Sequence, residues 1–118
     1  MFRTMLKSKL HGATVTQTEL YYEGSITIDA ELMLAADLLE GELVQVVNLN
    51  NGARIETYVI QGDPGSGVIC LNGPAARTAA VGDVIHVLGY GMYEDVEARS
   101  VQPKIAILGP GNRVMEQK

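Results

Sequence analysis

The chain has 118 residues, of which 47% are hydrophobic and 19% are charged; this favours one folded domain and excludes a disordered polar chain. Nine Lys and Arg residues against fourteen Asp and Glu residues give a net charge of −5, which argues against nucleic acids and anionic membranes as partners. Thirteen glycines without a collagen-like repeat indicate many tight turns and short strands.

Residues 4–15 have the pattern of an extended strand. Lys7, Lys9 and His11 recur in this segment at a spacing of two, which places them on one face of a strand. We expect Lys7 to be a solvated charge, whereas Lys9 and His11 are candidates for binding a small anion.

A short helix is predicted after the apolar run 25–28. Asp29 is a suitable N-cap, apolar residues recur at helical spacing over 32–39, and Gly41 is a suitable terminator.

A β-hairpin is predicted in the middle of the chain. The β-rich runs 43–49 and 54–60 are joined through an Asn-Gly turn, which is a strong hairpin signal. In the second run Arg54 and Tyr58 share one face and Thr57 lies on the other.

The rest of the chain is expected to contain three strands and two short helical segments, over 68–71, 74–79, 84–90, 92–98 and 104–108. The residues 109–118 are expected to form a flexible tail, so that one domain covers residues 1–108. Short strands with small helical inserts predict a mainly β barrel, and its low charge favours self-association.

Several common sites are not indicated by the sequence. No Cys-x-x-Cys or His-x-His pair is present, so no metal is expected, and the glycine-rich run 62–67 lacks the Lys of a phosphate-binding loop. The single cysteine, Cys70, lies in an apolar run and is expected to be a buried, unreactive thiol. Charges interrupt the N-terminus, and no apolar run approaches the ~18 residues of a membrane span, so we expect a cytoplasmic protein.

Several separated blocks of the sequence resemble the bacterial aspartate 1-decarboxylases, which are carboxy-lyases. The resemblance runs from Arg3 to about Leu108, and its matching spacing is more specific than any single dipeptide. The blocks are Lys9-Leu10-His11, Tyr22-Glu23-Gly24-Ser25, Asn51-Gly52, Arg54, Thr57-Tyr58, Asn72-Gly73, Ala75-Ala76 and Val81-Gly82-Asp83.

This resemblance implies a small six-stranded double-psi β-barrel made as an inactive proenzyme. Self-cleavage between Gly24 and Ser25 would give a small chain, 1–24, and a large chain, 25–118, whose first residue becomes a pyruvoyl group. That ketone would form a Schiff base with the substrate amine and act as an electron sink, so that neither a metal nor pyridoxal phosphate is needed.

The implied reaction converts L-aspartate to β-alanine and CO₂ for the synthesis of pantothenate and coenzyme A. The implied assembly is a homotetramer with active sites at subunit boundaries, and a maturation partner that assists the cleavage is compatible with the resemblance.

The resemblance also assigns roles to individual residues. Arg54, with Lys9, would bind the substrate side-chain carboxylate, since a guanidinium suits bidentate recognition of a carboxylate. Tyr58 would donate a proton after CO₂ is lost, and Thr57 would engage the Gly24 carbonyl during self-cleavage and then contact the substrate. The other implied site residues are His11, Tyr22, Asn72, Gly73, Pro74 and Ala75.

Three features of the sequence do not fit directly with the roles and the pattern that the resemblance implies. Adjacent strand residues point to opposite faces, so Thr57 and Tyr58 serve one pocket only if the strand is distorted or the pocket lies between subunits. Val47 stands where the family often has an aromatic residue, and His86 stands where an aliphatic residue is usual. These two departures affect the expected pocket shape and pH response.

Two other functions are compatible with the same residues. An uncleaved barrel could bind a small anion through Lys9, His11 and Arg54 without turnover. A cleaved enzyme could decarboxylate another acidic amino acid, such as glutamate.

Overall fold

The computed structural model describes residues 1–118 and consists mainly of strands. Its elements in chain order are β1 (Phe2–Thr14), β2 (Gln17–Glu19), β3 (Ser25–Asp29), α1 (Ala30–Ala36), β4 (Leu43–Asn48), β5 (Arg54–Gly62), β6 (Ile69–Asn72), the 3₁₀ helix η1 (Gly73–Thr78), β7 (Val84–Glu94), α2 (Asp95–Ala98), β8 (Lys104–Gly109), the 3₁₀ helix η2 (Pro110–Asn112) and β9 (Arg113–Gln117). The predicted mainly β class with short helical inserts is confirmed. No helix has both the length and the apolar character needed to cross a membrane.

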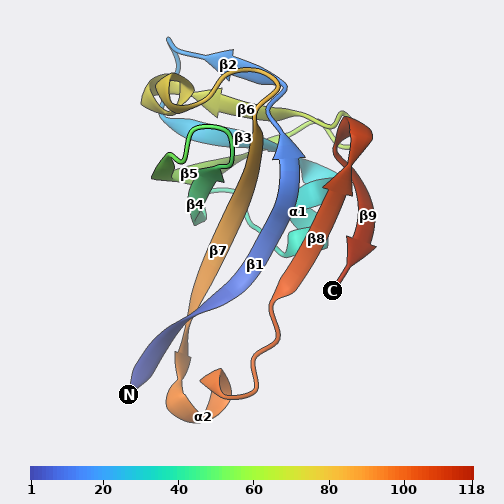
Figure 1. Ribbon diagram of the computed structural model, residues 1–118. Coiled ribbons are helices and arrows are strands. Elements are labelled where there is room, and N and C mark those ends of the chain that lie inside the picture. Colours follow the sequence, from blue (N-terminus) through green and yellow to red (C-terminus); the bar gives the residue numbers. More distant parts are fainter.

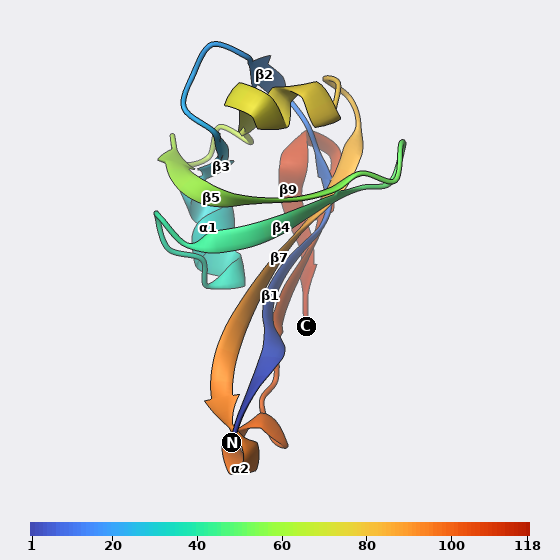
Figure 2. The same cartoon turned by 90° about the vertical axis from the view of Figure 1, so that its left-hand side faces the viewer.

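The strands form one sheet in the order β2-β6-β3-β5-β4-β7-β1-β8-β9 (Figures 1 and 2). The pairs β1–β8, β2–β6 and β3–β5 are parallel, and the other neighbours are antiparallel. β4 and β5 form the predicted hairpin. The sheet has nine strands where six were expected; the three-residue β2 and the C-terminal β9 are two of the additional strands.

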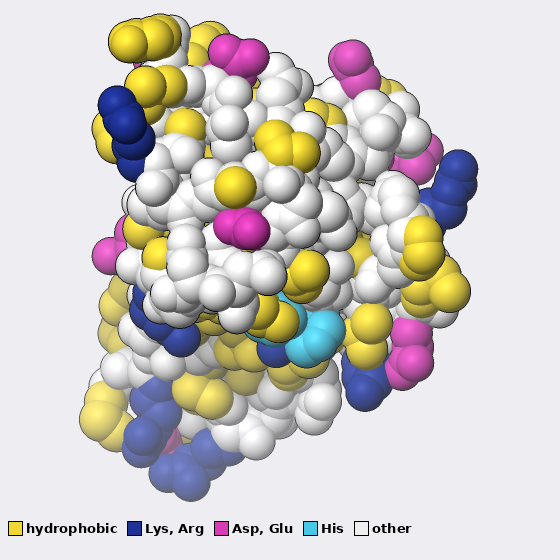
Figure 3. Space-filling view, turned by 45° about the horizontal axis from the view of Figure 1, so that its top comes forward, with side chains coloured by type: hydrophobic (Ala, Val, Ile, Leu, Met, Phe, Trp, Pro, Cys, Tyr) yellow, Lys and Arg dark blue, Asp and Glu magenta, His cyan; other side chains and the backbone are white.

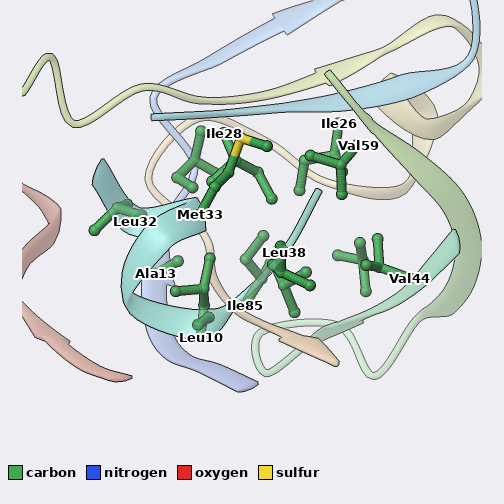
Figure 4. Close-up of a cluster of buried hydrophobic side chains, with 14 of the residues drawn as sticks. Leu10, Ala13, Ile26, Ile28, Leu32, Met33, Leu38, Val44, Val59 and Ile85 are labelled. Carbon is green, nitrogen blue, oxygen red and sulfur yellow. The ribbon is translucent and has the colours of Figure 1, made fainter. Parts of the chain in front are cut away.

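The sheet wraps around one core of 19 buried hydrophobic residues (Figure 4). The core takes Leu10 from β1, Ile26 and Ile28 from β3, and Ile85 from β7, all of which have no exposed surface. α1 contributes Met33 to the same cluster, so the helix packs against the inner face of the sheet. Apolar residues from strands far apart in sequence therefore share one interior.

α1 begins where the sequence predicts and ends earlier. The Asp29 side chain accepts from the Glu31 N–H at 2.8 Å and caps the helix. The helix ends at Asp37, whose φ of 55° is left-handed, rather than just before Gly41. An Asp tolerates this conformation, so the helix ends without a glycine.

The long strands β1 and β7 pair from Phe2–Glu94 to Thr14–Val84, and their outer ends project from the barrel beside α2 (Figures 1 and 2). β7 continues to Glu94, so only Asp95–Ala98 of the predicted helical segment 92–98 is helical.

A bulge in β1 changes the environment of Lys7. The pairing with β7 skips Lys7 between Leu6 and Ser8. Lys7 forms an ion pair with Glu42 at 3.0 Å and donates a hydrogen bond to the Asp37 carbonyl. The expectation that Lys7 is a solvated charge is therefore wrong, and the bulge also breaks the alternation that was expected to place Lys7 on one face with Lys9 and His11.

The C-terminal segment 109–118 is ordered by pairing, which corrects the expectation of a flexible tail. β9 pairs antiparallel with β8. Before it, the buried Asn112 has a φ of 57°; its Oδ1 accepts from the Thr14 N–H at 2.7 Å, and its Nδ2 donates to the carbonyls of Thr14 and Gly67 at 2.9 and 2.8 Å. This side chain joins the end of β1 to the loop before β6 and anchors the turn into β9.

Candidate functional site

Ser25 lies at the start of β3, inside the sheet. Its side chain is fully buried, and its Cα partner across the antiparallel pair is Asn72 on β6. Ser25 Oγ donates to the Glu23 carbonyl at 3.1 Å and accepts from Asn72 Nδ2 at 2.9 Å. Both hydrogen-bonding capacities of the hydroxyl are in use, so its oxygen is held in one position.

The backbone before Ser25 packs against Gly73 so closely that no side chain fits there. Gly73 has a φ of +64°, and a Cβ on it would lie 2.6 Å from the Tyr22 carbonyl oxygen and 2.9 Å from Gly24 Cα. Glycine at position 73 therefore allows the segment 22–24 to cross the start of η1. Gly24 itself is in a bend and its Cα faces the Pro74 ring.

A pocket of about 450 Å³ opens beside Gly24. β5 supplies one wall and the start of η1 supplies the other; the lining residues are Gly24, Ile55, Glu56, Thr57, Tyr58, Pro74, Ala75 and Thr78. Thr57 and Tyr58 both border this pocket although they alternate in direction along β5. Thr57 is half-buried, and Tyr58 is 37% exposed on the outer face.

Arg54 lies on the outer face of β5, on the same side as Tyr58, but it does not line this pocket. Its Nη1 donates to Gln45 Oε1 at 2.8 Å, and the Tyr90 hydroxyl donates to the same oxygen at 3.0 Å. The guanidinium is exposed and keeps other donors free for a ligand.

Lys9 and His11 are on β1, which is separated from β5 in the sheet by β4 and β7. Neither residue lines the pocket beside Gly24. Within one chain, therefore, the structure brings together Gly24, Ser25, Thr57, Tyr58, Asn72, Gly73, Pro74 and Ala75, and leaves Lys9, His11 and Arg54 outside this group. Tyr22 has its carbonyl against Gly73 and its side chain is exposed.

His11 and His86 form a stacked pair on the other part of the sheet. Their ring centroids are 4.1 Å apart, and His86 Nδ1 accepts from the Gly12 N–H at 3.0 Å. Burial lowers the pKa of His86, and His11 and Lys9 lower it further; burial, Lys9 and Lys118 lower the pKa of His11. Figure 3 shows histidine side chains exposed on one face with basic side chains near them.

Sequence reasoning did not assign several residues that surround Ser25 and the pocket. Cys70 is buried as predicted, and its thiol donates to Asn72 Oδ1 at 3.2 Å, while Asn72 Nδ2 also donates to Thr27 Oγ1 at 3.0 Å. A spacing of two between Cys70 and Asn72 was the available signal, but the predicted strand 68–71 stops one residue short of Asn72, which the structure includes in β6. Glu56 and Thr78 had no such signal, because only the fold brings η1 over β5.

A hydroxyl fixed beside a Gly-Ser peptide bond, next to an open pocket, can act as an internal nucleophile. In such a reaction Ser25 would supply the oxygen and Gly24 the carbonyl carbon, without a Cβ to shield it; Asn72 Nδ2 donates a hydrogen bond to that oxygen. The same start of β3 would carry a pyruvoyl group, and the buried Ser25 side chain with its polar partners fits a small ketone at this position.

Curated relatives align with nearly the whole chain. The aspartate 1-decarboxylase of Listeria monocytogenes serovar 1/2a is 58% identical over 97% of this chain and 90% of its own length. The enzymes of that name from Shouchella clausii and Moorella thermoacetica are 60% and 56% identical, over 98% and 100% of this chain and 91% and 92% of their own lengths. Among solved structures, a rationally designed protein is similar with a TM-score of 0.49 and 19% identity, over 65% of this chain and 90% of that chain.

The model of the aspartate decarboxylase family matches residues 1–115. That match covers the buried Ser25, Gly24 and Gly73, and the pocket between β5 and η1. Together with relatives of 56–60% identity, it shows that this chain belongs to the aspartate decarboxylase family.

Proposed function

We propose that this chain cleaves itself between Gly24 and Ser25 and then decarboxylates L-aspartate to β-alanine and CO₂, a step toward pantothenate. The observation that carries the proposal is the Ser25 hydroxyl, fully buried and held at 2.9 Å by Asn72 next to a pocket that Gly24 lines. Family membership supports the substrate, since relatives that are 58% and 60% identical to this chain are named aspartate 1-decarboxylase.

Self-cleavage follows from the groups around Ser25. Its Oγ attacks the Gly24 carbonyl carbon, the Oγ–C bond forms as the C–N bond breaks, and the hydroxyl proton passes to the released nitrogen. Loss of the Ser25 Cα proton and cleavage of its Cβ–Oγ bond then give a Gly24 carboxylate and dehydroalanine. Addition of water with loss of ammonia leaves the pyruvoyl group.

The two fragments stay together after cleavage. Residues 1–24 contain β1, which pairs with β7 and β8. Leu10 and Ala13 of β1, and Val15 just after it, lie in the core with no more than 1% of their surface exposed. Burial of this apolar surface holds the small chain without a covalent link.

The pyruvoyl group would supply a ketone that binds the substrate amine and accepts electrons as CO₂ leaves. Tyr58 lines the pocket, and its hydroxyl would return a proton to the substrate carbon. Thr57, which lines the same pocket, would engage Gly24 during cleavage and then contact the substrate. Pro74 and Ala75 line the opposite wall, and with Gly73 and Asn72 beside them they would help to bind the substrate.

The cationic residues would complete the site from two chains. Arg54 faces outward on the same side of β5 as Tyr58, and Lys9 and His11 lie on a different part of the sheet. A homotetramer with sites at subunit boundaries would place Lys9 and His11 of one protomer near the pocket of its partner, where the substrate carboxylates need positive charge. We place this tetramer in the cytoplasm, where it would make β-alanine.

Intact-mass spectrometry of the purified chain during warming tests the proposal. We expect the full-length chain to be replaced by the fragments 1–24 and 25–118, with the larger one lighter by one ammonia than a fragment starting with Ser25. Ser25→Ala is the matched control, which should stay full length and folded, because loss of one hydroxyl at a strand end rarely destroys a core.

The result separates the enzyme from the alternative of an uncleaved anion-binding barrel. A wild-type chain that stays full length after prolonged warming would overturn the proposal, and cleavage that persists in Ser25→Ala would overturn the mechanism. Comparison of aspartate with glutamate as substrates of the processed protein then tests the specificity.

A further inference from the structure

Four polar side chains form one hydrogen-bonded group where β3 and β6 pair. Ser25 is the Cα partner of Asn72, and Thr27 is the partner of Cys70, so the four lie at neighbouring positions of an antiparallel pair. Asn72 Nδ2 donates to Ser25 Oγ at 2.9 Å and to Thr27 Oγ1 at 3.0 Å, and Cys70 Sγ donates to Asn72 Oδ1 at 3.2 Å. The Nδ2 end of the Asn72 amide therefore bonds to Ser25 and Thr27, and its Oδ1 end bonds to Cys70.

The thiol determines which end of the Asn72 amide faces Ser25. If the amide were reversed, Nδ2 would face sulfur, which is a weak acceptor, and Oδ1 would face the Ser25 hydroxyl. Burial raises the pKa of the Cys70 thiol, and the charge of Glu19 raises it further, so sulfur keeps the proton that it donates. The orientation with Nδ2 toward Ser25 therefore has the better set of hydrogen bonds.

We propose that Cys70 is a positioning residue for self-cleavage, which acts by holding the Asn72 amide with its N–H groups toward Ser25 Oγ. This inference rests on the proposed function, because it concerns the same bond between Gly24 and Ser25. It adds a role for a thiol that the sequence alone marks as an inert core residue.

The orientation of the amide matters at two steps. In the acyl shift, Asn72 Nδ2 donates to one side of Ser25 Oγ, and the Ser25 hydroxyl proton is directed to the Glu23 carbonyl. These two hydrogen bonds fix the oxygen that attacks Gly24. In the elimination, the Ser25 Cβ–Oγ bond breaks and its electron pair stays on Oγ, now part of the Gly24 carboxylate. An N–H donor stabilises that developing charge, whereas a reversed amide would present Oδ1 and oppose it.

The test compares variants at position 70 that differ in whether the side chain can donate a hydrogen bond. Cys70→Ser keeps a donor, and Cys70→Val fills the space without one. Ile69→Val is the packing control, because Ile69 is buried on the same strand and its side chain lies outside the hydrogen-bonded group. We would warm purified full-length protein of each variant, of the wild type and of Ser25→Ala. Intact-mass spectrometry then follows the proportion of each protein that is cleaved.

We expect Cys70→Val to slow cleavage by about tenfold, as for loss of one oriented hydrogen bond, and Cys70→Ser and Ile69→Val to stay within about threefold of the wild type. Hydroxylamine, which cleaves esters, should trap more of the Gly24–Ser25 ester in Cys70→Val, because loss of the oriented donor slows the elimination, where charge develops on Oγ, more than it slows the acyl shift. Thermal melting of each full-length chain shows whether slow cleavage is separate from loss of folding.

Three results would overturn the inference. They are wild-type cleavage in Cys70→Val, equal slowing in Cys70→Ser and Cys70→Val, and equal slowing in Ile69→Val at the same melting temperature. If the wild type itself stays full length, the proposed function fails and the inference fails with it. If the wild type is cleaved and the Cys70 variants match it, the inference alone fails.

Discussion

Arg54 combines an exposed position with a single internal hydrogen bond, to Gln45 Oε1 at 2.8 Å, so most of its donors are available to a substrate carboxylate. Arg54→Lys keeps the charge and loses the planar pair of donors. We expect kcat/KM for aspartate to fall by about 10- to 100-fold, while self-cleavage proceeds at the wild-type rate.

Steady-state decarboxylation by fully processed protein measures this effect. Arg113→Lys, on the exposed strand β9, is the matched control and should keep wild-type kinetics. Unchanged kinetics in Arg54→Lys would remove Arg54 from the carboxylate site.

The stacked His11 and His86 rings link stability to pH. Burial and neighbouring positive charge hold the pKa of both side chains below the ordinary value of 6.5 in the folded state, so the unfolded chain binds more protons. The stability from the neutral pair is complete above about pH 6.5 and is lost as pH falls through the lower folded values.

His86→Asn isolates this contribution, because Asn offers an acceptor to the Gly12 N–H and does not titrate. We expect the melting temperature of the wild type to fall more between about pH 7 and pH 5 than that of His86→Asn. Parallel curves for the two proteins would show that the pair does not titrate on unfolding.

At the scale of residues, the sequence indicates which residues belong to the site better than it indicates their hydrogen-bond partners. The block from Tyr22 to Ser25, with Asn72 and Gly73, marks the residues that the fold gathers at one place. The hydrogen bond from the Cys70 thiol to Asn72 depends on strand register, and the positions of Glu56 and Thr78 on opposite walls of the pocket depend on how η1 crosses β5. Local sequence encodes neither.

At the scale of elements, Asn112 fastens the C-terminal part of the chain to the barrel. Its amide makes three hydrogen bonds, to the Thr14 N–H, the Thr14 carbonyl and the Gly67 carbonyl. Asn112→Gly keeps the left-handed backbone and leaves these groups without partners, which costs about 2–4 kcal/mol of unfolding free energy.

Urea unfolding at a fixed protein concentration measures this loss. Gln117→Ala, on the exposed end of β9, is the control and should change stability by less than about 0.5 kcal/mol. A similarly small change in Asn112→Gly would show that the barrel does not depend on this link.

Elements were predictable where their signals are local. The Asn-Gly hairpin of β4 and β5 and the Asp29 cap of α1 need only neighbouring residues. β9 was not predictable, because Pro110 and Gly111 have the composition of a loop, and the strand forms only against the edge that β8 presents. The bulge at Lys7 also arises from pairing, here with β7.

At the scale of the whole molecule, one chain carries two parts of a site that do not meet within it. The pocket with Tyr58 lies between β5 and η1, and Lys9 lies on β1, which β4 and β7 separate from β5 in the sheet. If a site takes Tyr58 from one protomer and Lys9 from its partner, an assembly that mixes two inactive variants contains some sites in which both residues are intact. Such a mixed assembly regains part of the activity. Co-expression of Lys9→Ala and Tyr58→Phe chains with different affinity tags, and purification through both tags, gives the mixed assemblies.

We expect the mixed assemblies to regain activity at up to about a quarter of their sites, since a random mixture pairs an intact Lys9 with an intact Tyr58 that often. Mixing Arg54→Ala with Tyr58→Phe is the control: both residues are on β5 of the same protomer, so every site keeps one defect and no activity returns. Decarboxylation assays of the doubly purified assemblies and of each variant alone measure the recovery. If neither mixture regains activity, then either Lys9 and Tyr58 of the same chain share a site or Lys9 lies outside the site. Either result would contradict a site shared between subunits.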